Sequence, residues 1–109
     1  MKSSVSQKNK TDLILFGVPG DFRGYYPGYS KDAIRYKNRF TWAVLKGHSR
    51  NRTGRVTLKN DNYLETPKIH FSYFEGEGAG EDMQAVLEGV NKVRSINRRT
   101  FGELSLIHI

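Results

Sequence analysis

The hydrophobic pattern of this chain changes its period at Gly80, and this change limits the possible folds more than any other feature. Upstream, apolar and polar residues alternate, which is typical of half-buried strands; downstream, apolar residues recur every three or four positions, which is typical of an amphipathic helix. The helical stripe contains five apolar residues and one polar residue: Met83, Val86, Leu87, Val90, Val93 and Asn97. Acidic residues at its start and arginines near its end complement the helix dipole. We therefore predict a helix from Glu81 to Arg99 that packs on the preceding strands.

Three segments upstream of this helix alternate in the manner of strands. The residues that share a face in each are Phe40, Trp42 and Val44, then Val56 and Leu58 (both predicted inward), then Ile69, Phe71 and Tyr73. Polar connections rich in glycine and asparagine separate the segments, and consecutive strands with short connections form an antiparallel meander. The predicted fold class is therefore α+β: an antiparallel β-meander with a packed amphipathic helix, as part of a larger domain.

A further strand is predicted near the N-terminus. Residues 12–18 form a short, almost continuous apolar run that Pro19 and Gly20 end, which is typical of a strand buried on both faces. Such a strand needs a layer of structure above it and another below. Residues 1–11 are polar and have no periodicity, so we expect a tail or linker there and a partial domain over residues 12–99.

The loop over residues 21–30 combines aromatic residues with glycine and proline. Glycine and proline here exclude a helix or a central strand. Its aromatic residues are Phe22, Tyr25, Tyr26 and Tyr29. Such a group can line a cavity or stack on flat ligands, and it can equally anchor a surface loop on the core. We keep it, together with Trp42 on the adjacent strand, as a candidate wall of a substrate cavity.

Positive charge is concentrated in one window of the chain. The sequence has 18 Lys and Arg against 11 Asp and Glu, a net charge of +7. Nine of the basic residues lie between Lys31 and Lys59 with one acidic residue: Lys31, Arg35, Lys37, Arg39, Lys46, Arg50, Arg52, Arg55 and Lys59. One interpretation is a nucleic-acid-binding module that tracks phosphates with this patch and stacks bases on Tyr25, Tyr26 and Tyr29. The other is a solvated face, or a face covered by a neighbouring domain.

The chain lacks the residues that several classes of function require. The chain has no cysteine, so disulfide scaffolds, zinc-thiolate sites and thiol nucleophiles are excluded. It has no apolar run of the ~20 residues that span a bilayer and no apolar core of a signal peptide, so a cytoplasmic location is the default. His48, His70 and His108 do not have metal-ligand spacing, but His48 lies in a loop beside Arg50 and remains a candidate site residue. The glycine-rich segment 74–81 lacks dinucleotide-binding spacing and carries carboxylates.

Ordered motifs from about Thr11 to Ile96 resemble the glucose–methanol–choline (GMC) family of FAD-dependent oxidoreductases. Residues 12–20, DLILFGVPG, are similar to the family's PDLFIFG-PG strand, with Thr11 where proline is usual. Residues 22–29, FRGYYPGY, match a bacterial branch closely, and residues 48–58 resemble the family's RG-V-L hairpin. Residues 67–94 resemble its P-I-N-YF…D…GV--VR run.

This resemblance implies a piece of a substrate-binding domain, an antiparallel sheet with helices packed on one side. The whole enzyme would oxidise a small alcohol by hydride transfer to FAD, with a histidine near the C-terminus as general base. The glycine-rich FAD fingerprint and the HP-GT region that supplies this histidine have no counterpart here, so the resemblance assigns no catalytic or cofactor-binding residue. The expected partners are the FAD-binding domain and the alcohol, and nucleic acid is the alternative.

The end of the chain departs from these motifs. Residues 104–109, LSLIHI, are also the translation of CTG-TCT-CTT-ATA-CAC-ATC, the end of a common sequencing-transposon adapter. We therefore expect residues 100–109 to be a truncated end whose last six residues derive from library preparation. The alternative is a genuine apolar tail.

Overall fold

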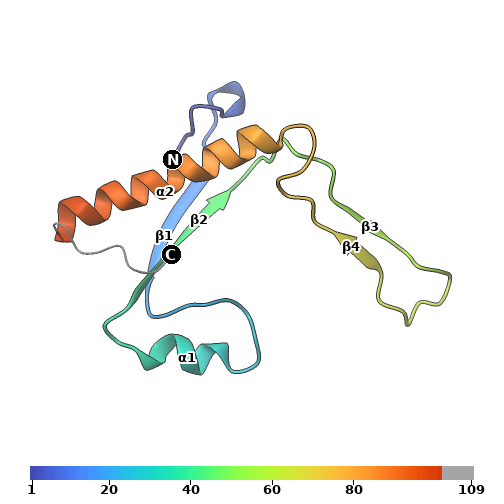
Figure 1. The fold of residues 1–109 in the computed structure, drawn as a ribbon, viewed down its shortest axis with the longest axis horizontal. Helices are drawn as coiled ribbons and strands as arrows, with labels where there is room; N and C mark the ends of the chain where they lie inside the picture. Colours follow the sequence, from blue (N-terminus) through green and yellow to red (C-terminus); the bar gives the residue numbers. More distant parts are fainter. Residues whose placement is uncertain (102–109) are drawn as a thin grey trace.

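The computed structural model describes residues 1–101, and the predictions for residues 102–109 lie outside this range. Seven elements follow one another along the chain: η1 (Gln7–Asn9), β1 (Leu13–Pro19), α1 (Tyr29–Arg35), β2 (Phe40–Lys46), β3 (Arg55–Thr57), β4 (Lys68–His70) and α2 (Ala79–Phe101). Two small antiparallel sheets and a long C-terminal helix confirm the α+β class (Figure 1).

The strands pair differently from the expected meander. β1 pairs with β2 over seven residue pairs, from Leu13 opposite Lys46 to Pro19 opposite Phe40, whereas β3 pairs with β4 in a separate sheet. The connection after β2 is diverted toward α2, because the backbone amides of Arg50 and Asn51 both donate to the carboxylate of Asp82, at 3.0 and 2.9 Å. This attachment separates β3 from the edge of β2.

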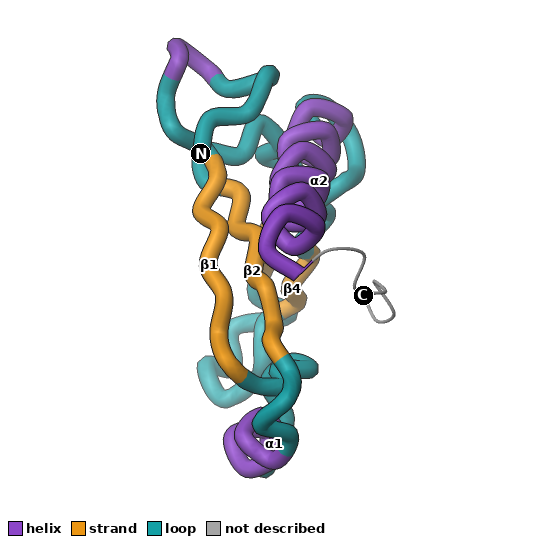
Figure 2. The backbone as a smooth tube through the Cα atoms, turned by 90° about the vertical axis from the view of Figure 1, so that its left-hand side faces the viewer, coloured by secondary structure: helices purple, strands orange, loops and turns teal. Residues whose placement is uncertain are grey.

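Helix α2 packs across one face of the β1–β2 hairpin, and Figure 2 shows it lying alongside both strands. Small residues form much of its contact line, since Ala85 is fully buried and a Cβ added to Gly89 would lie 2.5 Å from Cγ1 of Val44; Val93 of the predicted stripe is also buried. The predicted stripe is therefore partly wrong, since Met83 and Leu87 are 40% and 50% exposed. Small residues form the contact because they allow the helix backbone to approach the sheet closely.

The polar residue of the helical stripe has a specific partner. Asn97 accepts a hydrogen bond from the indole nitrogen of Trp42, at 3.1 Å. Both residues are half-buried between α2 and β2. A buried indole N–H needs an acceptor, and Asn97 supplies it at the point where the stripe is polar.

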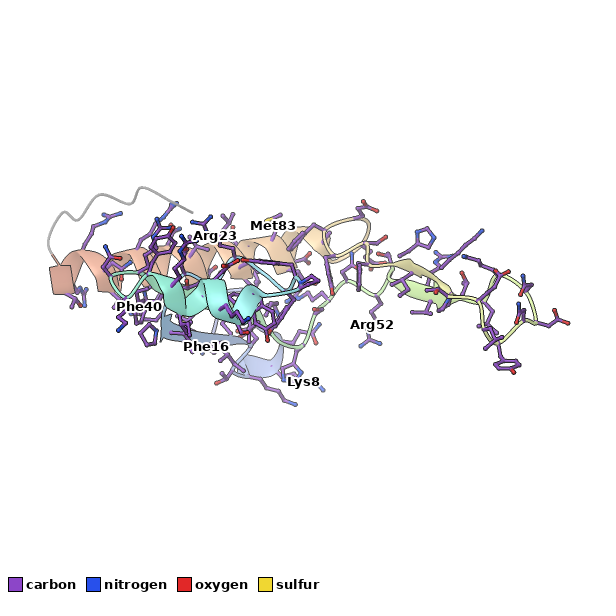
Figure 3. All side chains as sticks on the ribbon, turned by 90° about the horizontal axis from the view of Figure 1, so that it is seen from below. Lys8, Phe16, Arg23, Phe40, Arg52 and Met83 are labelled. Carbon is purple, nitrogen blue, oxygen red and sulfur yellow. The ribbon has the colours of Figure 1, made fainter. Side chains whose placement is uncertain are left out.

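Strand β1 is not buried on both faces. Leu13 is fully buried against α2, but Ile14, Phe16 and Val18 on the opposite face are 59%, 45% and 39% exposed. Leu45 of β2 lies beside Ile14 in the register and is 50% exposed. Figure 3 shows Phe16 on the side away from α2. The apolar run predicts two covering layers, and the described chain provides one.

Strands β3 and β4 form an arm that projects from the rest of the molecule (Figure 1). The prediction that Val56 and Leu58 point inward is wrong, because these side chains are 65% and 79% exposed. Ile69, which pairs with Val56, is 51% exposed. With only two short strands and no layer packed against them, the arm leaves its apolar residues in solvent.

The aromatic loop leads into a short helix that the glycine and proline pattern does not predict. Helix α1 begins at Tyr29, directly after Gly28, whose φ of 91° lies in the left-handed region. The exclusion of a helix from residues 21–30 is therefore wrong for its last two positions. Gly28 and Pro27 precede the helix, where neither interrupts its hydrogen bonds.

The N-terminal segment folds back onto the hairpin and is not a free tail. The α-amino group of Met1 donates to the carbonyl of Leu13, at 2.7 Å, and Ser3 is 2% exposed. Ser4 donates to the carboxylate of Glu88 on α2, at 2.8 Å from its backbone amide. Within residues 1–101, no helix is both long and apolar enough to cross a membrane.

Candidate functional site

The aromatic residues of the 21–30 loop form one cluster. Phe22, Tyr25 and Tyr29 contact each other edge to face, with ring centroids 5.1 Å (Phe22–Tyr25), 5.2 Å (Tyr25–Tyr29) and 6.0 Å (Phe22–Tyr29) apart. Tyr26 joins them through Tyr29, at 6.5 Å. Tyr25 is 84% exposed, so its ring is largely free to contact a ligand. The structure therefore brings the four candidate cavity residues of this loop into one cluster.

Backbone and hydroxyl contacts attach this cluster to the hairpin. The hydroxyl of Thr41 on β2 accepts from the amide of Phe22, at 3.0 Å, and donates to the carbonyl of Gly20, at 2.7 Å. The amide of Asp21 donates to the carbonyl of Ala33 in α1, at 2.9 Å. The loop is therefore held at both its start and its return into α1.

Charged groups surround the cluster but are already paired. Asp21 lies 2.8 Å from both Arg23 and Arg39, and the hydrogen bond from Arg23 lowers the pKa of Asp21. Tyr26 donates to Asp32, at 2.9 Å, and this bond raises the pKa of Tyr26. What the cluster offers is therefore aromatic surface and phenolic hydroxyl groups for binding, with the adjacent acids engaged in holding the loop.

Two candidate cavity residues lie apart from the cluster. Trp42 occupies the opposite face of β2, where its indole contacts Asn97 and its ring centroid lies 5.4 Å from that of Phe40. His48 follows the far end of β2, beyond Lys46, whereas the aromatic loop adjoins the Phe40 end (Figure 1). The structure thus unites the four loop aromatics and separates Trp42 and His48 from them.

A polar network lies beside the start of α2, and the sequence patterns did not predict it. Lys46 lies 3.4 Å from Asp12 and 3.8 Å from Asp82, and it donates to the carbonyls of Gly47 and His48, at 2.6 and 3.3 Å. Asp12 and Asp82 are 4% and 3% exposed. These residues lie directly before β1, on β2 and on α2, so only the tertiary fold brings them together.

Asp12 is the most heavily bonded carboxylate of this network. It accepts from the backbone amide and the hydroxyl of Ser3, at 2.8 and 2.7 Å. Desolvation by burial raises its pKa, but the two Ser3 bonds and the Lys46 ammonium outweigh burial, so the pKa lies below its ordinary value of 3.8. Asp12 therefore stays ionised and holds the N-terminal segment on the hairpin.

The basic window between Lys31 and Lys59 does not form one surface. Three of its charges pair within the described chain: Arg39 with Asp21, Lys46 with Asp12 and Asp82, and Arg50 with Glu81 at 3.1 Å. The remaining members divide between the α1 region and the β3–β4 arm, at separate ends of the molecule, and Figure 3 shows Arg52 at the root of that arm. This distribution does not favour the nucleic-acid interpretation.

No protein-family model, curated protein or solved structure shows a significant match to this chain.

Proposed function

We propose that the chain is part of the substrate-binding domain of a FAD-dependent alcohol oxidoreductase of the GMC type. The observation that carries the proposal is the apolar face of the β1–β2 hairpin that nothing in the described chain covers. Ile14, Phe16, Val18 and Leu45 form this face, opposite the one that α2 covers. A half-covered hairpin is the arrangement expected of a sheet whose remaining strands and layers belong to a larger domain.

The dimensions of the molecule support a larger domain. The accessible surface is 9050 Å², whereas a compact monomer of this mass exposes about 6,200 Å². The radius of gyration is 17.7 Å, against about 13 Å for a compact chain of this length. The accessible surface in excess of that of a compact monomer is available for contact with other parts of a parent enzyme.

The family motifs occupy consistent places in this arrangement. The segment that resembles the PDLFIFG-PG strand coincides with β1, and FRGYYPGY forms the aromatic cluster beside it. In the parent enzyme the exposed rings of Tyr25, Tyr26 and Tyr29 would line the substrate cavity. Trp42 would support the hairpin from the α2 side instead of lining the cavity.

The described residues do not fit FAD. The turn between β4 and α2 is rich in glycine, but a Cβ added to Gly78 would lie 2.7 Å from the backbone of Arg50, so this turn is filled by protein. Glu75, Glu77 and Glu81 carry carboxylates around it and would repel a pyrophosphate. The cofactor would therefore be held by another domain of the parent chain.

Recovery of the genomic locus by long-read sequencing tests the proposal. We expect the reading frame to extend upstream to a strand followed by GxGxxG and downstream to a histidine-bearing segment. The protein made from that frame should be yellow, and an alcohol substrate should bleach its flavin absorbance without oxygen. A frame that encodes no flavin-binding region, or a colourless product with FAD supplied, would overturn the proposal.

Substitution of one cluster residue in that parent enzyme tests the cavity assignment. Tyr25→Ala should raise the KM for the alcohol about five- to thirty-fold, because it removes an exposed ring worth ~1–2 kcal/mol of contact. Tyr63→Ala is the matched control, since Tyr63 is 90% exposed on the arm. Equal KM values for the two variants would remove Tyr25 from the substrate site.

A further inference from the structure

A small cavity on the side of the hairpin where the N-terminal segment folds back has a strongly basic lining. Its volume is about 150 Å³, and its lining residues are Val5, Gln7, Lys8, Lys10, Asp12, Lys46, His48 and Arg50. Four of these eight side chains are cations, one is an imidazole, and one is a carboxylate. Three separate segments supply them: η1 with its flanks, the residue directly before β1, and the end of β2 with the loop that follows.

The one carboxylate cancels only part of the charge of this lining, which has four cations. Both oxygens of Asp12 accept hydrogen bonds from Ser3, and its nearest cation is Lys46, at 3.4 Å. Arg50 is likewise engaged, since it donates to Glu81, at 3.1 Å, and to the carbonyl of Val5, at 2.6 Å. Lys46 and Arg50 are therefore held in place by these partners, and acidic neighbours balance part of their charge: Asp12 and Asp82 for Lys46, Glu81 for Arg50.

The donors available to a ligand come from the outer part of the lining. In residues 1–101, the side chains of Lys8, Lys10 and His48 form no hydrogen bond or ion pair with another described residue. Lys8 and His48 also have left-handed backbone conformations, with φ of 48° and 52°. Such conformations cost side-chain-bearing residues about 1–2 kcal/mol, and they gather at ligand sites more often than elsewhere.

We propose that this cavity binds a small tetrahedral oxyanion of the phosphate type, either free or as the terminal group of a larger molecule. Lys8 and Lys10 would contact its oxygens as cations, and His48 would donate a hydrogen bond from its ring. The volume of about 150 Å³ is large enough for one such anion together with water. This inference does not depend on the proposed oxidoreductase function.

A titration of the 109-residue chain with inorganic phosphate tests the site. The readout is the amide NMR signals of Lys8, Lys10 and His48, at constant ionic strength maintained with chloride. We expect saturable shifts at these amides. Shifts that rise linearly without saturation, or that spread over all basic residues, would overturn the site.

Paired substitutions make the test specific. Lys8→Gln with Lys10→Gln should weaken phosphate binding about tenfold or more, because each removes a charge-assisted hydrogen bond. Lys37→Gln with Lys59→Gln removes the same charge from α1's flank and the arm and should leave binding unchanged. An equal loss in both pairs would show a general charge effect and refute the site. The Trp42 indole signal, which reports its bond to Asn97, verifies that each variant is folded.

A phosphomonoester distinguishes the two sources of the anion. Tighter binding of a nucleoside monophosphate than of inorganic phosphate would identify the terminal phosphate of a larger molecule as the ligand. Equal affinity would identify the free anion. Failure of both ligands to bind would refute the proposal while leaving the oxidoreductase proposal untouched.

Discussion

Asp12 shows how much of the molecule depends on one side chain. Its carboxylate holds Ser3 of the N-terminal segment and lies beside Lys46 of β2, which in turn lies beside Asp82 of α2. In the sequence Asp12 is only the polar residue that precedes an apolar run. Its role comes from the groups that the fold brings to it, and these groups also set its protonation.

We expect Asp12→Asn to lower the free energy of unfolding by about 1.5–3 kcal/mol at neutral pH, because hydrogen bonds to a charged acceptor are lost. The pKa of Asp12 is lower in the folded chain than its ordinary 3.8, so its ionisation stabilises the fold above that value. This contribution declines as the pH falls through the lowered pKa. Urea unfolding at a series of pH values should therefore show the two proteins converging in acid.

Asp61→Asn is the control for this series, since Asp61 is exposed in the connection between β3 and β4. It should change the free energy of unfolding by less than about 0.5 kcal/mol at any of these pH values. If Asp12→Asn behaves like Asp61→Asn at neutral pH, the network around Lys46 does not hold the N-terminal segment in place.

At the scale of elements, the contact between α2 and the hairpin depends on small residues. Gly89 lies against Val44 and Leu15, and an added Cβ would meet them at 2.5 and 3.4 Å. Gly80, in the first turn of the same helix, has open space around it. Two glycines on one helix therefore have opposite expected responses to the same substitution.

We predict that Gly89→Ala destabilises the chain by ~1–2 kcal/mol, since overpacking against β2 exceeds the gain in helix propensity. Gly80→Ala should stabilise it by up to ~1 kcal/mol, because only the propensity changes. Thermal unfolding followed by circular dichroism compares the two. A stabilising Gly89→Ala would mean that α2 does not approach the sheet as closely as the structure shows.

At the scale of the whole molecule, the uncovered face of β1 distinguishes an isolated unit from part of a larger domain. In the 109-residue chain Phe16→Ser should lower the free energy of unfolding by only ~1 kcal/mol and reduce self-association, because Phe16 is 45% exposed and its ring is only partly buried. In the proposed parent enzyme the same substitution should destabilise by ~3 kcal/mol, since a buried ring would be lost.

Leu15→Ala is the matched control, because Leu15 faces α2 in the described chain. It should destabilise both proteins by ~2 kcal/mol. Chemical denaturation and light scattering give the stability and the association state. A Phe16→Ser parent as stable as the unchanged enzyme would show that no layer of that enzyme covers this face.

The sequence predicts local elements well where one residue pattern is sufficient. β1, β2 and α2 lie close to their predicted ranges, because proline, glycine and hydrophobic period act over a few residues. The pairing of the strands was less predictable, because it depends on contacts between distant residues. The hydrogen bonds from the backbone of Arg50 and Asn51 to Asp82, which separate β3 from β2, join residues about thirty positions apart. The cluster of Phe22, Tyr25, Tyr26 and Tyr29 was predictable because its members are close in the sequence. The separation of Trp42 and His48 from it was not.

The sequence by itself therefore determined the α+β class, the strand segments and the amphipathic helix, since these depend on backbone preference and hydrophobic period. Only the tertiary structure decided which strands pair, which face of β1 remains uncovered and which cations surround the cavity beside His48. The physical reason is that burial and charge pairing arise between distant residues. No local pattern in residues 1–11 predicts that Ser3 will hold Asp12 or that Lys8 and Lys10 will adjoin His48.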